Sequence, residues 1–188
     1  IAFLEHIDSL QSEAGRSKIV RFSAELFYKS KVQNSHLSAK EVDTFISLMV
    51  SLMETDTSYR VRSEAARRLR EVASPKLVDR HHSSVLNAYE KHKDLEILLL
   101  YASLPSCQPE KAVKMARAVK TKSMGGACMI NSILARFGDQ SAIDALIAKA
   151  ENTSKIGGLS LSNLLSALAF THSDKIKRFL VKGLRSED

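Results

Sequence analysis

Helix-start signals return along this chain at a nearly constant interval, and this rhythm constrains the fold more than any other feature. Residues that favour the position just before a helix occur at Ser38, Ser74, Gln108, Ser141 and Ser173. Their spacing of about 32 to 36 residues is enough for two short helices and two turns. A single helix pair cannot bury its apolar face alone, so such pairs stack on their neighbours. The interval therefore predicts an array of stacked helix pairs.

Local signals support helices throughout the chain. Ser38 and Glu41 have the spacing of a capping box, in which each side chain accepts a hydrogen bond from the other residue's backbone N–H. Pro75 and Pro109 stand where a first helical residue is expected, and Gly138 stands where a helix-terminating glycine belongs. Apolar residues recur with a period of about 3.6 residues, and no stretch sustains the alternation of a strand. We expect an all-α protein.

Two segments of the second half of the chain are similar to each other. The sequence GGACMINSILA (Gly125–Ala135) aligns with GGLSLSNLLSA (Gly157–Ala167), and both begin with a glycine pair. Asn131 and Asn163 occupy equivalent positions in the two segments. This internal similarity supports a repeat architecture. The glycine pairs allow tight turns or close helix packing, and an anion site at the helix starts is the less favoured interpretation.

Residues 56–78 resemble a HEAT repeat, whose second helix opens with an acidic residue followed by Val-Arg, alanines and a leucine. The matching residues are Asp56, Val61, Arg62, Ala65, Ala66 and Leu69. The stretch from Arg16 to Pro75 is also similar to the bacterial HEAT-like family called domain of unknown function 2336. The matching residues are Arg16, Leu26, Phe27, Leu37, Ser38, Glu41, Leu52, Val61, Arg62, Ala66, Arg68, Leu69 and Pro75. The resemblance implies a fold and no chemistry.

The predicted architecture is a right-handed α-solenoid of HEAT- or armadillo-like helix pairs, with about ten or eleven helices. We expect one domain over residues 1–188. Because the sequence begins with Ile1 and not with Met, we leave open that it is a fragment of a longer protein. Cys107 and Cys128 form no CxxC pair, which is typical of a reducing compartment. The longest apolar run, Leu95–Leu104, is about half of a membrane span. We expect a cytoplasmic protein without membrane association.

Arginines are concentrated in the segment YRVRSEAARRLREVASP (Tyr59–Pro75). On a helix, Arg60, Arg67 and Arg70 point away from the apolar stripe, where Glu64 and Glu71 partly neutralise them. In the HEAT pattern the equivalent of Arg62 pairs with acidic or backbone groups of the adjacent turn or repeat, and Asp56 or Asp94 could serve. A solvated helix face is the favoured interpretation of the arginines, and a grip for phosphates is the alternative.

Two further surfaces are candidates for partner binding. The helix expected from Pro109 to Lys122 carries a basic face opposite its apolar stripe, formed by Lys111, Lys114, Arg117 and Lys120. This face suits an acidic or anionic partner, although a solvated outer helix is the alternative. The second helices of the later pairs, expected around residues 95–104, 127–137 and 159–170, are poor in charge. They either line an inner surface for a peptide or are covered by neighbouring helices. Candidate contact residues there are Asn131, Ser132, Arg136, Asn163 and Ser166.

The sequence contains no catalytic, cofactor-binding or metal-binding signature. His81, His82 and His92 lack the HExxH spacing, and no P-loop, GxGxxG or GxSxG pattern occurs. We therefore expect a non-enzymatic HEAT-like scaffold that binds a protein or peptide. The alternative is nucleic-acid binding, favoured by a net charge of +7. The HEAT-like alkylpurine DNA glycosylases use groove aromatics and a catalytic Asp, but this chain has no Trp and no motif for that Asp.

Overall fold

The computed structural model describes residues 12–32, 37–153 and 173–185, and all regular structure within these ranges is helical. This confirms the all-α prediction. The described ranges hold about nine helices longer than one turn, slightly fewer than the ten or eleven expected. Within the same ranges, no helix combines the length and the apolar character that a membrane span requires. The chain divides into two compact units, Ile1–Cys107 and Gln108–Asp188, which are described separately.

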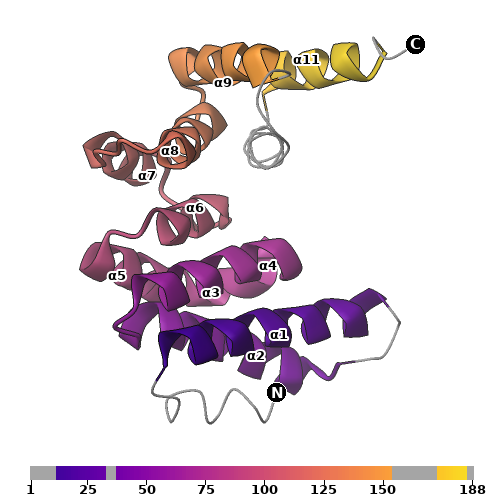
Figure 1. Ribbon diagram of the computed structural model, residues 1–188, viewed down its shortest axis with the longest axis vertical. Helices are drawn as coiled ribbons and strands as arrows, with labels where there is room; N and C mark the ends of the chain where they lie inside the picture. The colour runs from indigo at the N-terminus through magenta and orange to yellow at the C-terminus, as the bar shows by residue number, and fades with distance from the viewer. Residues whose placement is uncertain (1–11, 33–36, 154–172, 186–188) are drawn as a thin grey trace. The chain divides into compact units, whose positions relative to one another are not determined.

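The first unit arranges its helices in two layers (Figure 1). Its helices are α1 (Glu13–Val32), α2 (Ala39–Thr55), α3 (Tyr59–Val72), α4 (Pro75–Val78), α5 (His82–His92) and α6 (Leu95–Ser103), with a 3-10 turn at Asp79–His81. In one layer α3 packs between α1 and α6, and in the other α2 packs on α5. The layers are joined because α2 also packs on α3, and α5 on α6. Helix α3 is therefore in contact with α1, α2 and α6.

The core of the first unit lies between these layers. Phe27 of α1 stacks on Phe45 of α2 with ring centroids 4.5 Å apart, and Met49, Met53 and Leu69 are fully buried nearby. Burying an apolar side chain of this size contributes about 1.5–3 kcal/mol. The charge-poor helix α6 is buried from Glu96 to Ser103. Of the two interpretations of this helix, the structure therefore supports the covered one.

The second unit contains α7 (Pro109–Ala118), α8 (Met124–Arg136), α9 (Gln140–Thr153) and α11 (Asp174–Arg185). Helix α8 packs on both α7 and α9, and α11 contacts α9. Their shared core includes the fully buried residues Ala112, Ala116, Ile133, Leu146 and Ile176. The buried alanines of α7 bring its backbone close to α8, while the longer side chains of α8 and α9 fill the space between them.

Most of the predicted helix ends are present. Ser38 and Glu41 form the complete capping box. Gly138 has a φ of +90°, and its N–H donates to the carbonyl of Ala135 while the next N–H donates to Leu134, as in a Schellman motif. Helix α9, however, starts at Gln140, two residues earlier than a cap at Ser141 would place it. Asp139 takes the capping role, because its carboxylate accepts the N–H of Ala142 at 3.1 Å.

Candidate binding surfaces

Arg62 is a structural residue of the first unit. Its side chain is only 8% exposed, and its Nε lies 2.7 Å from a carboxylate oxygen of Asp94, the residue before α6. One guanidinium nitrogen also donates to the carbonyls of Asp56 and Thr57, each at 2.9 Å. Arg62 therefore joins the α2–α3 turn to the start of α6. Of the two partners considered from the sequence, Asp94 provides the carboxylate and Asp56 provides a backbone carbonyl.

Arg16 of α1, the helix that precedes α3 in the same layer, makes a similar contact. Its Nε lies 2.7 Å from a carboxylate oxygen of Asp56, and a second nitrogen donates to the other oxygen at 3.2 Å. Asp56 lies in the turn between α2 and α3, three residues before α3 begins, and Asp94 is the residue directly before α6. In both cases an arginine on one helix of the α1–α3–α6 layer binds an aspartate in the turn that leads into the next helix of that layer. The two pairs form an arginine–aspartate ladder, which runs Arg16–Asp56 and Arg62–Asp94.

Glu64 accepts hydrogen bonds from three arginines. Arg21 of α1 donates to it at 3.1 Å, while Arg67 and Arg68 of its own helix donate at 2.7 and 3.0 Å. Burial alone would raise the pKa of Glu64, but the hydrogen bonds from Arg67 and Arg68 outweigh it and lower the pKa below its usual value. Both Arg67 and Arg68 also pair with Glu71, at 3.5 and 2.9 Å. This part of the arginine helix is largely neutralised.

Arg70 faces the neighbouring helix, whereas the helical projection placed it on the outside. Its guanidinium lies 3.1 Å from the carboxylate of Glu96 on α6, and its side chain is 20% exposed. Burial raises the pKa of Glu96, and the charge of Arg70 opposes that rise. The difference arises because α3 has neighbours on both flanks, α1 and α6, so its buried arc is wider than a single stripe. Arg60 alone keeps the predicted exposure, at 63%, with a 3.9 Å contact to Glu13.

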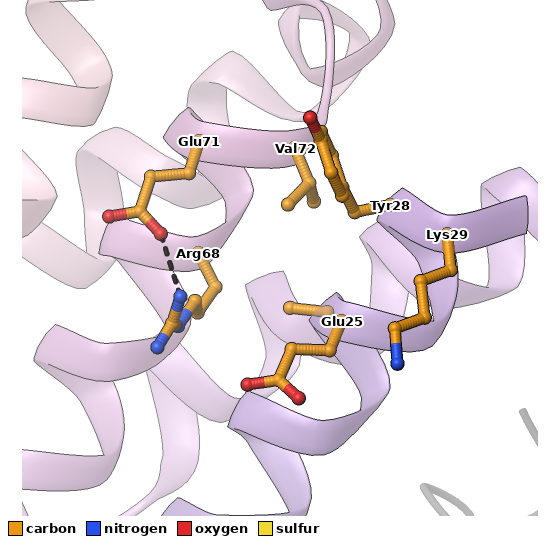
Figure 2. Close-up of a pocket in the computed structure, with 7 residues that line it drawn as sticks. Glu25, Tyr28, Lys29, Arg68, Glu71 and Val72 are labelled. Carbon is orange, nitrogen blue, oxygen red and sulfur yellow. Dashed lines mark hydrogen bonds and ion pairs between the residues drawn. The ribbon is translucent and has the colours of Figure 1, made fainter. Parts of the chain in front are cut away.

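A hollow of about 300 Å³ lies between α1 and α3 (Figure 2). The side chains of Tyr28 and Val72 form an apolar wall on one side, and the bonded pair Arg68–Glu71 stands on another. Glu25 and Lys29 extend from α1 at the rim. The lining of the hollow therefore includes two acidic and two basic side chains, so the hollow has no net preference for a cation or an anion.

The basic face of α7 is less neutralised than the arginine helix. Lys114 is exposed and has no ion pair within the described residues, whereas Arg117 lies 2.9 Å from Asp139 and is still 64% exposed. The half-buried Lys111 has a partner of its own. The helix ends at Ala118, earlier than predicted, and Lys120 therefore lies in the following loop and leaves the helical face. Lys120 is exposed, like Lys114.

The loop from Val119 to Ser123 is fixed by side-chain hydrogen bonds that the sequence did not suggest. The hydroxyl of Thr121 accepts the N–H of Ser123 at 3.2 Å, and the hydroxyl of Ser123 accepts the N–H of Gly126 at 3.0 Å. A Cβ on Gly126 would lie 2.5 Å from the hydroxyl oxygen of Thr121, so the loop requires glycine there. Ser123 thus caps α8 and occupies one of the N–H groups considered for an anion.

Asp139 was also missed, although the Gly-Asp pair at the end of α8 is a typical signal for one helix ending and another beginning. The hydroxyl of Ser141, the guanidinium of Arg117 and the N–H of Ala142 lower the pKa of Asp139 to about 2. Because Arg117 belongs to α7, this carboxylate also ties α7 to the start of α9.

The candidate contact residues of the charge-poor helices are placed only in part. Asn131 of α8 is half-buried, and Arg136 is half-buried with a partner of its own. Ser132 is buried, and its hydroxyl donates to the carbonyl of Cys128 at 2.6 Å, so its side chain is not available to a partner. Asn163 and Ser166 lie outside the described residues.

The described ranges contain no group of three or more His, Cys, Asp or Glu side chains that would hold a metal ion. Comparison with protein-family models, with curated proteins and with solved structures finds no match.

Proposed function

We propose that this chain is a HEAT-like α-solenoid scaffold that binds another protein and has no catalytic activity of its own. The arginine–aspartate ladder carries the proposal. Arg16–Asp56 and Arg62–Asp94 link successive helices of one layer by the same contact. A contact repeated from one helix pair to the next is what a stacked array needs to fix the position of each repeat. Stacked helix pairs form extended concave surfaces that commonly bind other macromolecules, and the binding role is inferred from this fold-level analogy.

The ionisable groups support binding rather than catalysis. Among the described residues, each carboxylate with a lowered pKa, such as Glu64 or Asp139, owes the lowering to hydrogen bonds from neighbouring residues. Glu96 has a raised pKa, but it is buried against Arg70 within the packed layer and does not line the hollow between α1 and α3. A catalytic acid or base has to reach its substrate, and these groups are engaged with the protein itself.

Nucleic-acid binding is the second candidate, and one observation favours it. Lys114 and Lys120 are exposed and have no ion pair within the described ranges, as phosphate contacts would require. The arginines of α3 give it less support than their number suggests. Four of the five donate to acidic side chains within the protein, and Arg60 is close to Glu13.

Affinity capture followed by reconstitution tests the scaffold proposal. The full chain is immobilised and exposed to lysate of its source cell, with and without nuclease treatment, and each retained protein is purified for calorimetric titration. We expect one retained protein to bind the purified chain with a saturable, stoichiometric isotherm after nuclease treatment. Loss of every retained protein on nuclease treatment, together with salt-dependent binding of duplex DNA, would support the nucleic-acid alternative instead.

Of Asn131 and Ser132, Asn131 is the better position for probing the charge-poor surface of α8. Asn131→Arg introduces a bulky charge at a half-buried position. Ser132→Arg would force a charge into the core, because Ser132 is only 1% exposed, and its effect would reflect unfolding. If this surface contacts the partner, Asn131→Arg weakens binding with helicity unchanged. Unchanged affinity would place the contact elsewhere.

A further inference from the structure

The end of α7 and the loop that follows carry a concentration of positive charge that acidic groups of the described residues neutralise only in part. Between Pro109 and Gly126 the sequence has five basic residues and one acid, Glu110. Lys114, Lys120 and Lys122 are exposed, and none has an ion pair within the described residues. The α7–loop surface is defined here as Lys114, Arg117, Lys120, Lys122 and Met124.

The loop presents two of these lysines to solvent. Burial alternates along it, since Val119 and Thr121 are half-buried while Lys120 and Lys122 are exposed. The hydroxyl of Thr121 accepts the N–H of Ser123, and the hydroxyl of Ser123 accepts the N–H of Gly126, so two hydrogen bonds hold the end of the loop at the start of α8. The two lysines therefore project from a segment that is already ordered. Ordering before binding reduces the conformational entropy that a partner contact must overcome.

Lys122 also stands where a positive charge is unfavourable for the fold. It lies two residues before α8, whose first turn contains no acidic residue. The N-terminus of a helix carries a partial positive charge, and a nearby cation is repelled by it. Arg117 is held toward the start of α9 by Asp139 but remains 64% exposed. A negatively charged partner would relieve the repulsion at Lys122 and contact Arg117 as well.

The residues around this charge favour a peptide over a nucleic acid. The segment from Pro109 to Gly126 contains no aromatic residue, so it offers no platform on which bases could stack. It does present Met124, which is 50% exposed. Methionine is enriched at protein interfaces, where its flexible side chain adapts to apolar groups.

We infer that the α7–loop surface binds an acidic segment of a partner protein, whose carboxylates contact the lysines and Arg117 and whose apolar residue packs on Met124. This inference rests on the protein-binding role proposed above. From Lys114 to Lys122 the surface is at most about 20 Å long, given rises of about 1.5 Å per helical and 3.3 Å per extended residue. An extended peptide of about six residues covers it.

A fluorescein-labelled peptide of Glu-Glu-Leu repeats, about ten residues long so that it covers this span, is the probe. Its affinity for the full chain is measured by fluorescence anisotropy at low salt. The double variant Lys120→Glu/Lys122→Glu should bind it about tenfold or more weakly. Lys40→Glu/Lys76→Glu is the matched control, because it changes exposed lysines of the first unit and alters the net charge equally. Its affinity should change less than about twofold.

Three outcomes would overturn the inference: no peptide binding, equal weakening in the two double variants, or tighter binding of a DNA strand of equal charge that Lys120→Glu/Lys122→Glu abolishes. The far-UV circular dichroism spectrum checks that both variants remain folded, and Lys114→Glu provides a second test within a regular helix. The captured partner protein separates this inference from the general proposal. If the partner binds Lys120→Glu/Lys122→Glu as tightly as the unmodified chain, the scaffold role stands and the α7–loop assignment fails.

Discussion

Replacing Arg62 with alanine tests whether the arginine helix serves the fold. The change removes a side chain that is 8% exposed and leaves the carboxylate of Asp94, 5% exposed, without its counterion. It also removes the donor to the carbonyls of Asp56 and Thr57. Breaking a buried ion pair by deleting one partner costs about 3–5 kcal/mol. Since a domain has only about 5–15 kcal/mol of stability, the expected loss is a large fraction of the total.

Urea unfolding followed by circular dichroism measures this loss. With a slope of about 1.5 kcal/mol per molar for a unit of this size, a loss of 3 kcal/mol lowers the midpoint by about 2 M. Arg60→Ala is the matched control on the same helix, and it should cost less than about 0.5 kcal/mol because Arg60 is 63% exposed. In Arg62→Ala, backbone amides of α3 and of the start of α6 should exchange with solvent faster than in the unmodified chain.

A double replacement separates the ion pair from the packing of the side chain. Arg62→Met with Asp94→Leu removes both charges and keeps most of the volume, so it should be less destabilising than Arg62→Ala alone. The reasoning is refuted if Arg62→Ala is no more destabilising than Arg60→Ala. That result would mean that Arg62 is held only loosely and is available to a ligand.

Three further predictions concern the helix ends. Gly126→Ala should destabilise the second unit by about 1–3 kcal/mol, and by less when it is combined with Thr121→Ala. Gly125→Ala should be neutral or slightly stabilising, because a Cβ at Gly125 meets no atom within 4 Å. Thermal unfolding would show this order, and equal effects at the two glycines would contradict it. Ser38→Ala should cost about 0.5–2 kcal/mol through loss of the capping box, and an unchanged unfolding midpoint would count against it. Asp139 has a folded pKa of about 2, below the unfolded value of about 3.9, so its stabilising effect is present above the unfolded pKa and is lost as pH falls toward 2. The difference in unfolding free energy between the unmodified chain and Asp139→Asn should therefore be constant near neutral pH and shrink in acid, whereas a difference independent of pH would refute the assignment.

The features that sequence reasoning predicted well depend on neighbouring residues. The capping box of Ser38 and Glu41 and the left-handed glycine at Gly138 each depend on fewer than six consecutive residues. Glycine adopts a positive φ without the strain that a Cβ causes, and a Ser–Glu pair at this spacing supplies both hydrogen bonds of the box, so a few residues identify each helix end. The start of α9 was displaced by two residues because Ser141 and Asp139 are both good caps, and only the backbone path selects between them.

The contacts between helices were harder to predict. The partner of Arg62 was narrowed to two aspartates because the HEAT pattern supplied the long-range information. For Arg70 no such pattern was available, and a projection around one helix could not show that α6 brings Glu96 against it. The hydrogen bonds that join Thr121, Ser123 and Gly126 were missed for a similar reason, since hydroxyl groups give no signal in hydrophobic periodicity.

Hydrogen–deuterium exchange of the full chain, with and without the purified partner protein, tests the central claim most directly. The claim is that the arginines of α3 hold the first unit together, while the α7–loop surface contacts the partner. Binding should slow exchange of backbone amides between Pro109 and Gly126 and leave α3 unchanged. Protection of α3, with no change between Pro109 and Gly126, would contradict the account.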